Sequence, residues 1–332
     1  MRVLVLGGTR FIGRRIVERL HARGDQVLVV HRGTSEPPDW IPVAHLHAHR
    51  YDLAAHAERL RTFDPDAVVD TYALTAADVD AVLPVLPKVP TVVLSSQDVY
   101  QAAVGLRTGR PEASVPLTED AELRRERYPY RGAEMPGVPE DYDKLDVEER
   151  WLPRRAVVLR LPMVYGPHDE QVREDLVLRR VRAGRRQMPV GAGNLLWSRT
   201  HVDDVASATL AALDTRDADA QPVNLGERTT PTIRVWMEQI IAAATADLEL
   251  VRIPDEHLPP DLALLGAPGQ HLLGSTQRAQ DLLNWQPPDP ADRVATSVHW
   301  HLQHPPQTAW NDQHSQAEAA ALSTARTTNR PG

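Results

Sequence analysis

The sequence contains no cysteine among its 332 residues. Disulfide bonds, thiolate metal ligands and cysteine nucleophiles are therefore excluded. Lysine is almost as scarce, because only Lys88 and Lys144 occur among the 37 basic residues. A lysine rarely stands at a given position by chance in such a chain, and this draws attention to Lys144.

The sequence also has no run of about 18 apolar residues, the length that would predict a transmembrane helix. It has no excess of positive charge, since the formal net charge is −8, whereas nucleic-acid-binding domains usually carry a basic face. We therefore expect a cytoplasmic protein that binds neither membranes nor nucleic acid. Hydrophobic residues make up 42% of the chain, which is enough to form a core.

Residues 3–13 have the pattern of a phosphate-binding turn. Apolar residues 3–6 predict a buried strand, Gly7 and Gly8 a tight turn, and Phe11 the start of a helix. The spacing is Gly7-x-x-Arg10-x-x-Gly13. Backbone N–H groups and the positive end of a helix dipole attract anions at such a turn, so it predicts a site for the pyrophosphate of a dinucleotide.

Short apolar strands and helices alternate along the first half of the chain. Strands are expected at residues 26–30, 45–52, 66–71, 91–95 and 156–161, and helices at 53–62, 75–86 and 141–151. This alternation predicts an α/β fold with a Rossmann-type doubly wound parallel sheet in the strand order 3-2-1-4-5-6. Residues 101–139 interrupt the alternation and are expected to form a long loop on the substrate side.

Six motifs follow one another in an order that is typical of one family. They are the turn at residues 7–13, Asp52-Leu53, residues 94–100, Lys144-x-x-x-Glu148, residues 159–167 and residues 201–206. Over about residues 1–305 the chain resembles the extended short-chain dehydrogenase/reductases, the NAD(P)-dependent epimerase/dehydratase family. The resemblance implies a nicotinamide dinucleotide that contacts Gly7, Thr9, Arg10, Phe11, Ile12, Gly13, Asp52, Leu53, Thr71, Tyr72, Ala73, Ser95, Lys144 and Pro162.

The resemblance also suggests how the chain is divided. Residues 1–165 would form the cofactor-binding domain, completed by about residues 199–225. Residues 166–198 and 226–305 would form a smaller substrate-binding lobe. Residues 306–332 are polar, and we expect a flexible tail with at most a short helix at 316–325.

Charge near the expected ribose indicates which dinucleotide is bound. NAD sites usually end the second strand with an acidic residue, whereas arginine suits the 2′-phosphate of NADP. Here that strand ends in His31-Arg32, and Arg10 stands inside the glycine turn. Arginine pairs well with phosphate, so Arg10 and Arg32 favour NADP, while NAD stays possible.

The family's catalytic pattern is incomplete in this chain. The family uses a serine, and a tyrosine four residues before a lysine, so that both lie on one helix face. Ser96 and Lys144 match, but Glu140 stands at the tyrosine position, and Tyr142 would be turned about 200° from Lys144 on a regular helix. Three interpretations remain: an irregular helix start presents Tyr142, Glu140 or Asp98 acts as the acid/base, or the protein does not carry out the standard alcohol oxidation.

The expected substrate side departs from the family as well. Members that bind nucleotide sugars carry an arginine four residues before the histidine that matches His201, where this chain has Trp197, and Arg199 lies two residues closer. A flat apolar contact at Trp197 would suit an aromatic, glycoside or polyketide-like substrate, and we expect a sugar or secondary metabolite. The candidate substrate residues are Trp197, Arg199, Tyr100, Tyr128 and Tyr130.

Three histidines alternate along the expected third strand. His45, His47 and His49 would share one face, a spacing that can hold a metal. The third strand is an edge strand in the predicted order, however, so we expect a partly solvated row of side chains and no metal.

These features predict an NADP-dependent oxidoreductase or epimerase/dehydratase. Hydride would be transferred at a carbinol or carbonyl carbon of a small molecule, and two copies would pair through the helices at 75–86 and 141–151. Two alternatives remain open. One is a non-redox isomerase, dehydratase or cyclase that retains the dinucleotide, and the other is a catalytically silent NADP-binding sensor.

Overall fold

A computed structural model describes residues 1–37, 40–215, 221–307 and 310–328. Seven parallel strands form one sheet in the order β10-β6-β5-β4-β1-β2-β3. The predicted order 3-2-1-4-5-6 is therefore confirmed, and β10 extends the sheet beyond β6. The strands are β1 (Arg2–Leu6), β2 (Gln26–His31), β3 (Ala44–His47), β4 (Ala67–Asp70), β5 (Thr91–Ser96), β6 (Val157–Leu161) and β10 (Pro222–Asn224).

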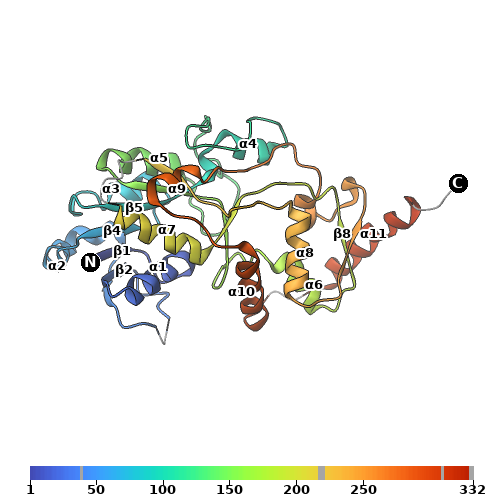
Figure 1. Cartoon of the computed structure of the whole chain (residues 1–332), viewed down its shortest axis with the longest axis horizontal. Helices are drawn as coiled ribbons and strands as arrows, with labels where there is room; N and C mark the ends of the chain where they lie inside the picture. Colours follow the sequence, from blue (N-terminus) through green and yellow to red (C-terminus); the bar gives the residue numbers. More distant parts are fainter. Residues whose placement is uncertain (38–39, 216–220, 308–309, 329–332) are drawn as a thin grey trace.

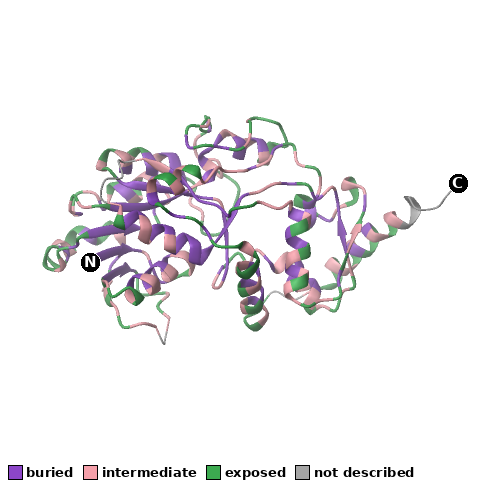
Figure 2. Cartoon of the chain, viewed as in Figure 1, coloured by how far each residue is buried: buried purple, intermediate pink, exposed green. Residues whose placement is uncertain are grey.

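Helices cover both faces of the sheet because successive strand residues point to opposite sides. Val3 and Val5 belong to the core beneath α1 (Phe11–Ala22), α7 (Val202–Asp214) and α9 (Gln277–Leu283). Leu4 and Leu6 belong to the core beneath α2 (Ala57–Phe63), α3 (Ala76–Asp80) and α5 (Lys144–Trp151). The sheet is thus buried between two helical layers (Figures 1 and 2).

The C-terminal half forms a second body with its own core. β7 (Met163–Tyr165) pairs with β9 (Arg199–His201), and β8 (Gln187–Val190) pairs with β11 (Glu249–Arg252). The helices α6 (Asp175–Arg182), α8 (Ile233–Ala243) and α10 (Pro290–Gln303) surround a core that includes Trp236 and Met237. Figure 1 shows this body beside the carboxyl-terminal edge of the large sheet.

Several predicted boundaries differ from the structure. The third strand ends at His47, and Arg50–His56 forms a 3-10 helix. The expected loop at 101–139 begins with α4 (Gln101–Thr108). The expected helix at 141–151 starts only at Lys144, because the Asp143 side chain accepts a hydrogen bond from Leu145 N and caps the helix there.

The expected flexible tail is also corrected, because α11 (Asp312–Thr328) continues the fold. Its Glu318 is buried and pairs with the buried Arg180 of α6, and Ala321 is buried beside it. Residues 308–309 and 329–332 of the expected tail, and residues 216–220, lie outside the described residues. Within the described ranges, the helices are too short or too polar to cross a membrane.

Candidate active site

The glycine turn after β1 is packed against the loop after β4. Gly7 has φ +92°, and a Cβ atom there would lie 2.3 Å from Thr71 Oγ1, which donates a hydrogen bond to Leu6 O. A Cβ on Gly13 would lie 2.8 Å from both the Cα and the N of Gly8. Only glycine fits these positions. The chain changes direction across the sheet between β1 and β4, the place where open α/β sheets bind their ligands.

The first turn of α1 is open to an anion. Arg10 is the N-cap residue, and its side chain makes no capping hydrogen bond, so the first-turn amides keep their donors for a ligand. Thr9 Oγ1 lies 2.7 Å from Ser35 Oγ, which ties the turn to the segment after β2. The glycines, the uncapped helix start and the close backbone packing together fit the pyrophosphate of a dinucleotide.

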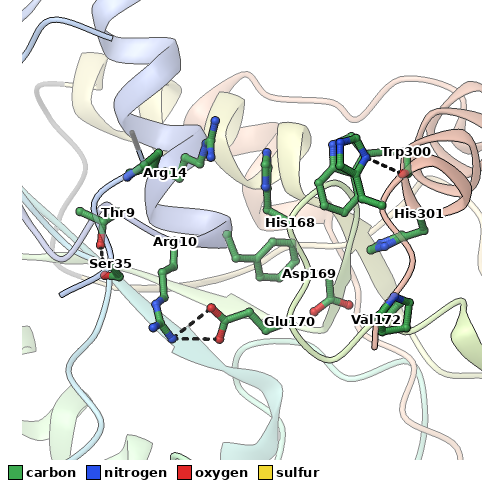
Figure 3. Close-up of a pocket in the computed structure, with 14 residues that line it drawn as sticks. Thr9, Arg10, Arg14, Ser35, His168, Asp169, Glu170, Val172, Trp300 and His301 are labelled. Atoms are coloured by element: carbon green, nitrogen blue, oxygen red, sulfur yellow. Dashed lines mark hydrogen bonds and ion pairs between the residues drawn. The ribbon is translucent and has the colours of Figure 1, made fainter. Parts of the chain in front are cut away.

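Arg10 turns toward the C-terminal body rather than toward β2. Its Nη1 lies 3.1 Å from Glu170 Oε1, as Figure 3 shows. The pair stands at an open pocket of about 440 Å³ that is lined by α1, the 168–172 loop and the end of α10. Arg32 is exposed instead. The Arg10–Glu170 pair is largely exposed and therefore weak, so both Arg10 and Arg32 stay available for the predicted 2′-phosphate contact.

Some of the other predicted cofactor residues have accessible side chains, and others have buried ones. Tyr72 is 53% exposed at the carboxyl end of β4, Asp52 is exposed, and Pro162 is half-buried. Leu53 is fully buried in the core instead. The Ser95 hydroxyl donates to Glu148 Oε1 at 2.6 Å inside the protein, so its predicted cofactor contact is wrong for the side chain. Ser95 and Ser96 are adjacent on β5, and adjacent strand residues face opposite sides.

Four of the predicted catalytic residues meet where β5 ends and α5 begins. The Tyr142 hydroxyl donates to Asp98 Oδ2 at 2.9 Å, and the Tyr130 hydroxyl donates to the same oxygen at 3.4 Å. Ser96 Oγ accepts the Asp98 backbone N–H at 3.1 Å. Lys144 Nζ donates to Ala73 O at 2.6 Å and to Leu94 O at 3.1 Å, which links β5 to the loop after β4.

Burial controls the protonation of this group. Burial raises the pKa of Asp98, although Arg124 and the Tyr142 hydrogen bond oppose the shift. Burial and the neighbouring Asp98 charge raise the pKa of Tyr142 well above its ordinary value. Burial lowers the pKa of Lys144. Tyr142 is therefore a neutral phenol at neutral pH, which can donate a proton but is a poor base. Asp98 Oδ1 is buried and has no hydrogen-bond partner among the described residues.

Glu140 does not join this group. Its carboxylate accepts the Gly132 N–H at 2.9 Å, and the residue is exposed. The structure does not bring Glu140, one of the expected acid/base candidates, to Lys144, because α5 starts at Lys144 and the two residues do not share a helix. Tyr142 also precedes the helix, so the angle of about 200° between Tyr142 and Lys144 that a regular helix would impose does not apply.

A buried ion pair that no sequence pattern predicts adjoins this group. Arg124 and Asp143 have fully buried side chains, and the Arg124 guanidinium donates to both Asp143 oxygens at 2.5 and 3.1 Å. Arg124 also donates to Asp98 O at 3.1 Å. Asp143 in turn accepts the Tyr128 N–H. Arg124 lies in the irregular 101–139 segment, where no local pattern marks its role.

The predicted substrate residues are placed differently. Tyr100 is fully buried, and its hydroxyl donates to Asn224 Oδ1 at 2.7 Å, so it belongs to the core. Arg199 is also buried, with its guanidinium over the Trp236 ring and one donor on Pro231 O. Arg199 faces inward on β9, so the expected contact of its side chain with a substrate is not formed. Tyr128, Tyr130 and Trp197 remain half-buried.

The parallel sheet and the glycine turn are those of a dinucleotide-binding α/β protein. The family model "NAD dependent epimerase/dehydratase family" matches residues 3–84 and 147–226. The chain belongs to this family and is an enzyme of its class.

Three relatives cover most of the chain. A 3-diazoavenalumate denitrifying reductase from a Streptomyces species is 28% identical and covers 88% of this chain and 98% of its own length. A 2′-dehydrokanamycin reductase from Streptomyces kanamyceticus is 28% identical, and the match covers 77% of this chain and 70% of the reductase. The chloroplast stem-loop binding protein of 41 kDa b from Arabidopsis thaliana is 25% identical, and the match covers 86% of this chain and 75% of that protein.

Solved structures share the fold. The dTDP-glucose 4,6-dehydratase of Bacillus anthracis, determined in complex with NAD, superposes with a TM-score of 0.68 over 92% of this chain and 97% of its own. The two sequences are 18% identical, so this similarity concerns the fold.

Proposed function

We propose that the protein is an NADP-dependent oxidoreductase that reduces a carbonyl group of a sugar or secondary-metabolite substrate. The observation that carries this proposal is the hydrogen bond from Tyr142 to the buried Asp98, next to Ser96 and Lys144. The reductase names of two relatives support the direction of the reaction. A bound reduced nicotinamide dinucleotide would supply the hydride.

Tyr142 is the proposed proton donor to the substrate oxygen. Carbonyl reduction needs a protonated phenol and alcohol oxidation needs a phenolate, and the raised pKa of Tyr142 keeps it in the protonated form. Burial raises the pKa of Asp98, and in its protonated form its Oδ2–H would donate to the Tyr142 oxygen, which reverses the hydrogen bond and frees the phenol proton for the substrate. The substrate oxygen would take that proton, Asp98 would pass its own proton to Tyr142, and water would then reprotonate Asp98. After this relay the new negative charge lies on Asp98. Without it, Tyr142 would become a phenolate next to the Asp98 carboxylate. The Tyr130 hydroxyl then stabilises the Asp98 carboxylate.

Ser96 and Lys144 have positioning roles in this proposal. The Ser96 oxygen accepts from the Asp98 backbone, so its hydroxyl proton is free to be donated to the substrate oxygen. Lys144 holds the loop after β4 against β5, where the resemblance puts the nicotinamide ribose.

Arg32 supports the choice of NADP, because it is exposed and follows a strand that ends without an acid. The dimer through α3 and α5 and the cytoplasmic location stay predictions.

Steady-state reduction of a panel of sugar and aromatic ketones tests the function, with NADPH and NADH compared side by side. We expect NADPH to be preferred and Tyr142→Phe and Asp98→Asn each to lower kcat by about 100-fold or more. Tyr51→Phe is the matched control, since Tyr51 is exposed and its hydroxyl donates to Asp78 Oδ1.

Three results would count against parts of the proposal. An unchanged kcat in Tyr142→Phe would remove Tyr142 from the reaction. Equal use of NADH would contradict the choice of NADP. Tight NADPH binding without reduction of any ketone would favour the sensor or the non-redox alternative instead.

A further inference from the structure

Three histidines and a glutamate meet at the carboxyl ends of β2 and β3. His31 ends β2, His45 and His47 lie two residues apart on β3, and Glu36 lies in the turn after β2. The two strands pair in parallel with His31 opposite His47. Residues two apart share a face of a strand, so the three imidazoles are brought to one side of the sheet edge.

The donor atoms of the four side chains are close enough to surround one ion. All four lie within 4.8 Å of one another. Glu36 Oε2 is 3.0 Å from His47 Nε2, and Glu36 Oε1 is 3.6 Å from His45 Nε2. His31 Nε2 is 2.8 Å from His45 Nδ1. Ligand atoms about 3.3 Å apart surround a tetrahedral Zn²⁺, so small side-chain movements suffice.

The donor types of the group also suit a transition metal. Three imidazoles and one carboxylate form the nitrogen-rich donor set that zinc and neighbouring transition metals prefer.

We propose that His31, Glu36, His45 and His47 bind one divalent transition-metal ion, with Zn²⁺ as the expected metal. The ion would fasten the turn after β2 to the sheet edge. Ser35 of that turn bonds Thr9 of the glycine turn, so the metal site adjoins the cofactor cradle. The proposal rests on the donor geometry alone and does not depend on the proposed reaction.

Metal binding requires one local change. The Gly33 N–H donates to His31 Nδ1 at 3.1 Å, so the neutral ring carries its proton on Nε2, the atom that faces the other donors. Coordination through Nε2 moves that proton to Nδ1, and the Gly33 N–H must turn away. Gly33 is exposed, so water can accept its hydrogen bond.

His49 provides a matched control within the same row of histidines. β3 ends at His47, and His49 instead accepts the Tyr51 N–H and stacks on the Tyr51 ring at 5.0 Å. It is therefore outside the cluster although it continues the alternation of His45 and His47.

Untagged protein, stripped with a chelator, should be titrated with Zn²⁺ in competition with a chromophoric chelator. We expect one equivalent per chain, bound at least about tenfold more weakly by His45→Ala, His47→Ala and Glu36→Gln, and unchanged in His49→Ala. Co²⁺ should give the visible absorption of a tetrahedral ion, and the three variants should lose it. Glu36 is exposed, so Glu36→Gln tests the site even where a histidine variant misfolds.

The proposal is overturned if no equivalent binds at micromolar Zn²⁺. It is also overturned if His49→Ala weakens binding as much as His45→Ala, or if the Co²⁺ spectrum survives in Glu36→Gln and His47→Ala.

Discussion

Replacing Arg124 by methionine should destabilise the protein strongly through Asp143. Methionine keeps much of the side-chain volume but removes the two bonds to Asp143 and those to Asp98 O and Glu126 O. Both side chains of the ion pair are fully buried, so no water replaces the lost donors. Breaking a buried pair by removing one partner typically costs about 3–5 kcal/mol. That loss is a large part of the 5–15 kcal/mol that holds a typical domain folded.

The pH dependence of this loss follows from Asp143. Its pKa is lowered in the folded protein because, although burial opposes ionisation, the Arg124 hydrogen bonds and the Tyr128 N–H outweigh it. The stability that this shift contributes is present above the ordinary carboxyl pKa and is lost as the pH falls through the folded value. Without Arg124, burial dominates and raises the pKa. The deficit of Arg124→Met should therefore be largest at neutral pH and shrink as the pH falls toward about 4.

Urea denaturation followed by circular dichroism, at several pH values, measures this deficit. Arg125→Met is the matched control, since Arg125 is exposed and pairs with Glu122 on the surface, and its loss should stay below about 1 kcal/mol. A loss below about 1 kcal/mol for Arg124→Met at neutral pH, or a deficit that is independent of pH, would refute the reasoning.

Two further predictions concern the cofactor cradle and a buried acid. Gly13→Ala should weaken NADPH binding more than tenfold in a fluorescence titration, because its Cβ would press on the Gly8 backbone. A Cβ on Gly266, whose φ is −76°, meets its nearest atom at 3.4 Å, so Gly266→Ala should leave the affinity intact. Burial raises the pKa of Glu174 from 4.5 to about 7, so the folded state binds more protons than the unfolded state in this window, and stability falls as the pH rises through it. The free energy of unfolding of Glu174→Gln, measured by urea denaturation, should rise relative to that of the wild type by up to about 3 kcal/mol between pH 4.5 and pH 8. The same dependence of unfolding free energy on pH in both proteins would contradict this.

Local patterns in the sequence were sufficient to predict the fold and the glycine turn. The spacing of apolar residues reports strand and helix directly, and Gly7 and Gly13 stand where a Cβ would collide with the backbone or with Thr71. Such constraints act within a few residues, so they are visible without tertiary structure. The strand order followed because the alternation of strands and helices permits few topologies.

The candidate catalytic group was only partly visible in the sequence. Motifs pointed to Ser96, Asp98 and Lys144, but the position of Tyr142 depended on where α5 starts, and Asp143 decides that by capping the helix. Asp143 is held in turn by Arg124, 19 residues earlier in the chain. A helix boundary of this kind is set by a distant partner, which no local pattern encodes.

The sequence by itself thus determined the parallel sheet and the glycine turn, because both arise from periodicity and from steric limits on neighbouring residues. Tertiary structure alone decided which side chains meet. It joined Tyr142 to Asp98, turned Arg10 to Glu170, and buried Tyr100 and Arg199. It also brought His31 and Glu36 to the histidines of β3, in a group that the row of alternating histidines did not predict. Contacts between distant segments depend on how the strands pair and where each one ends.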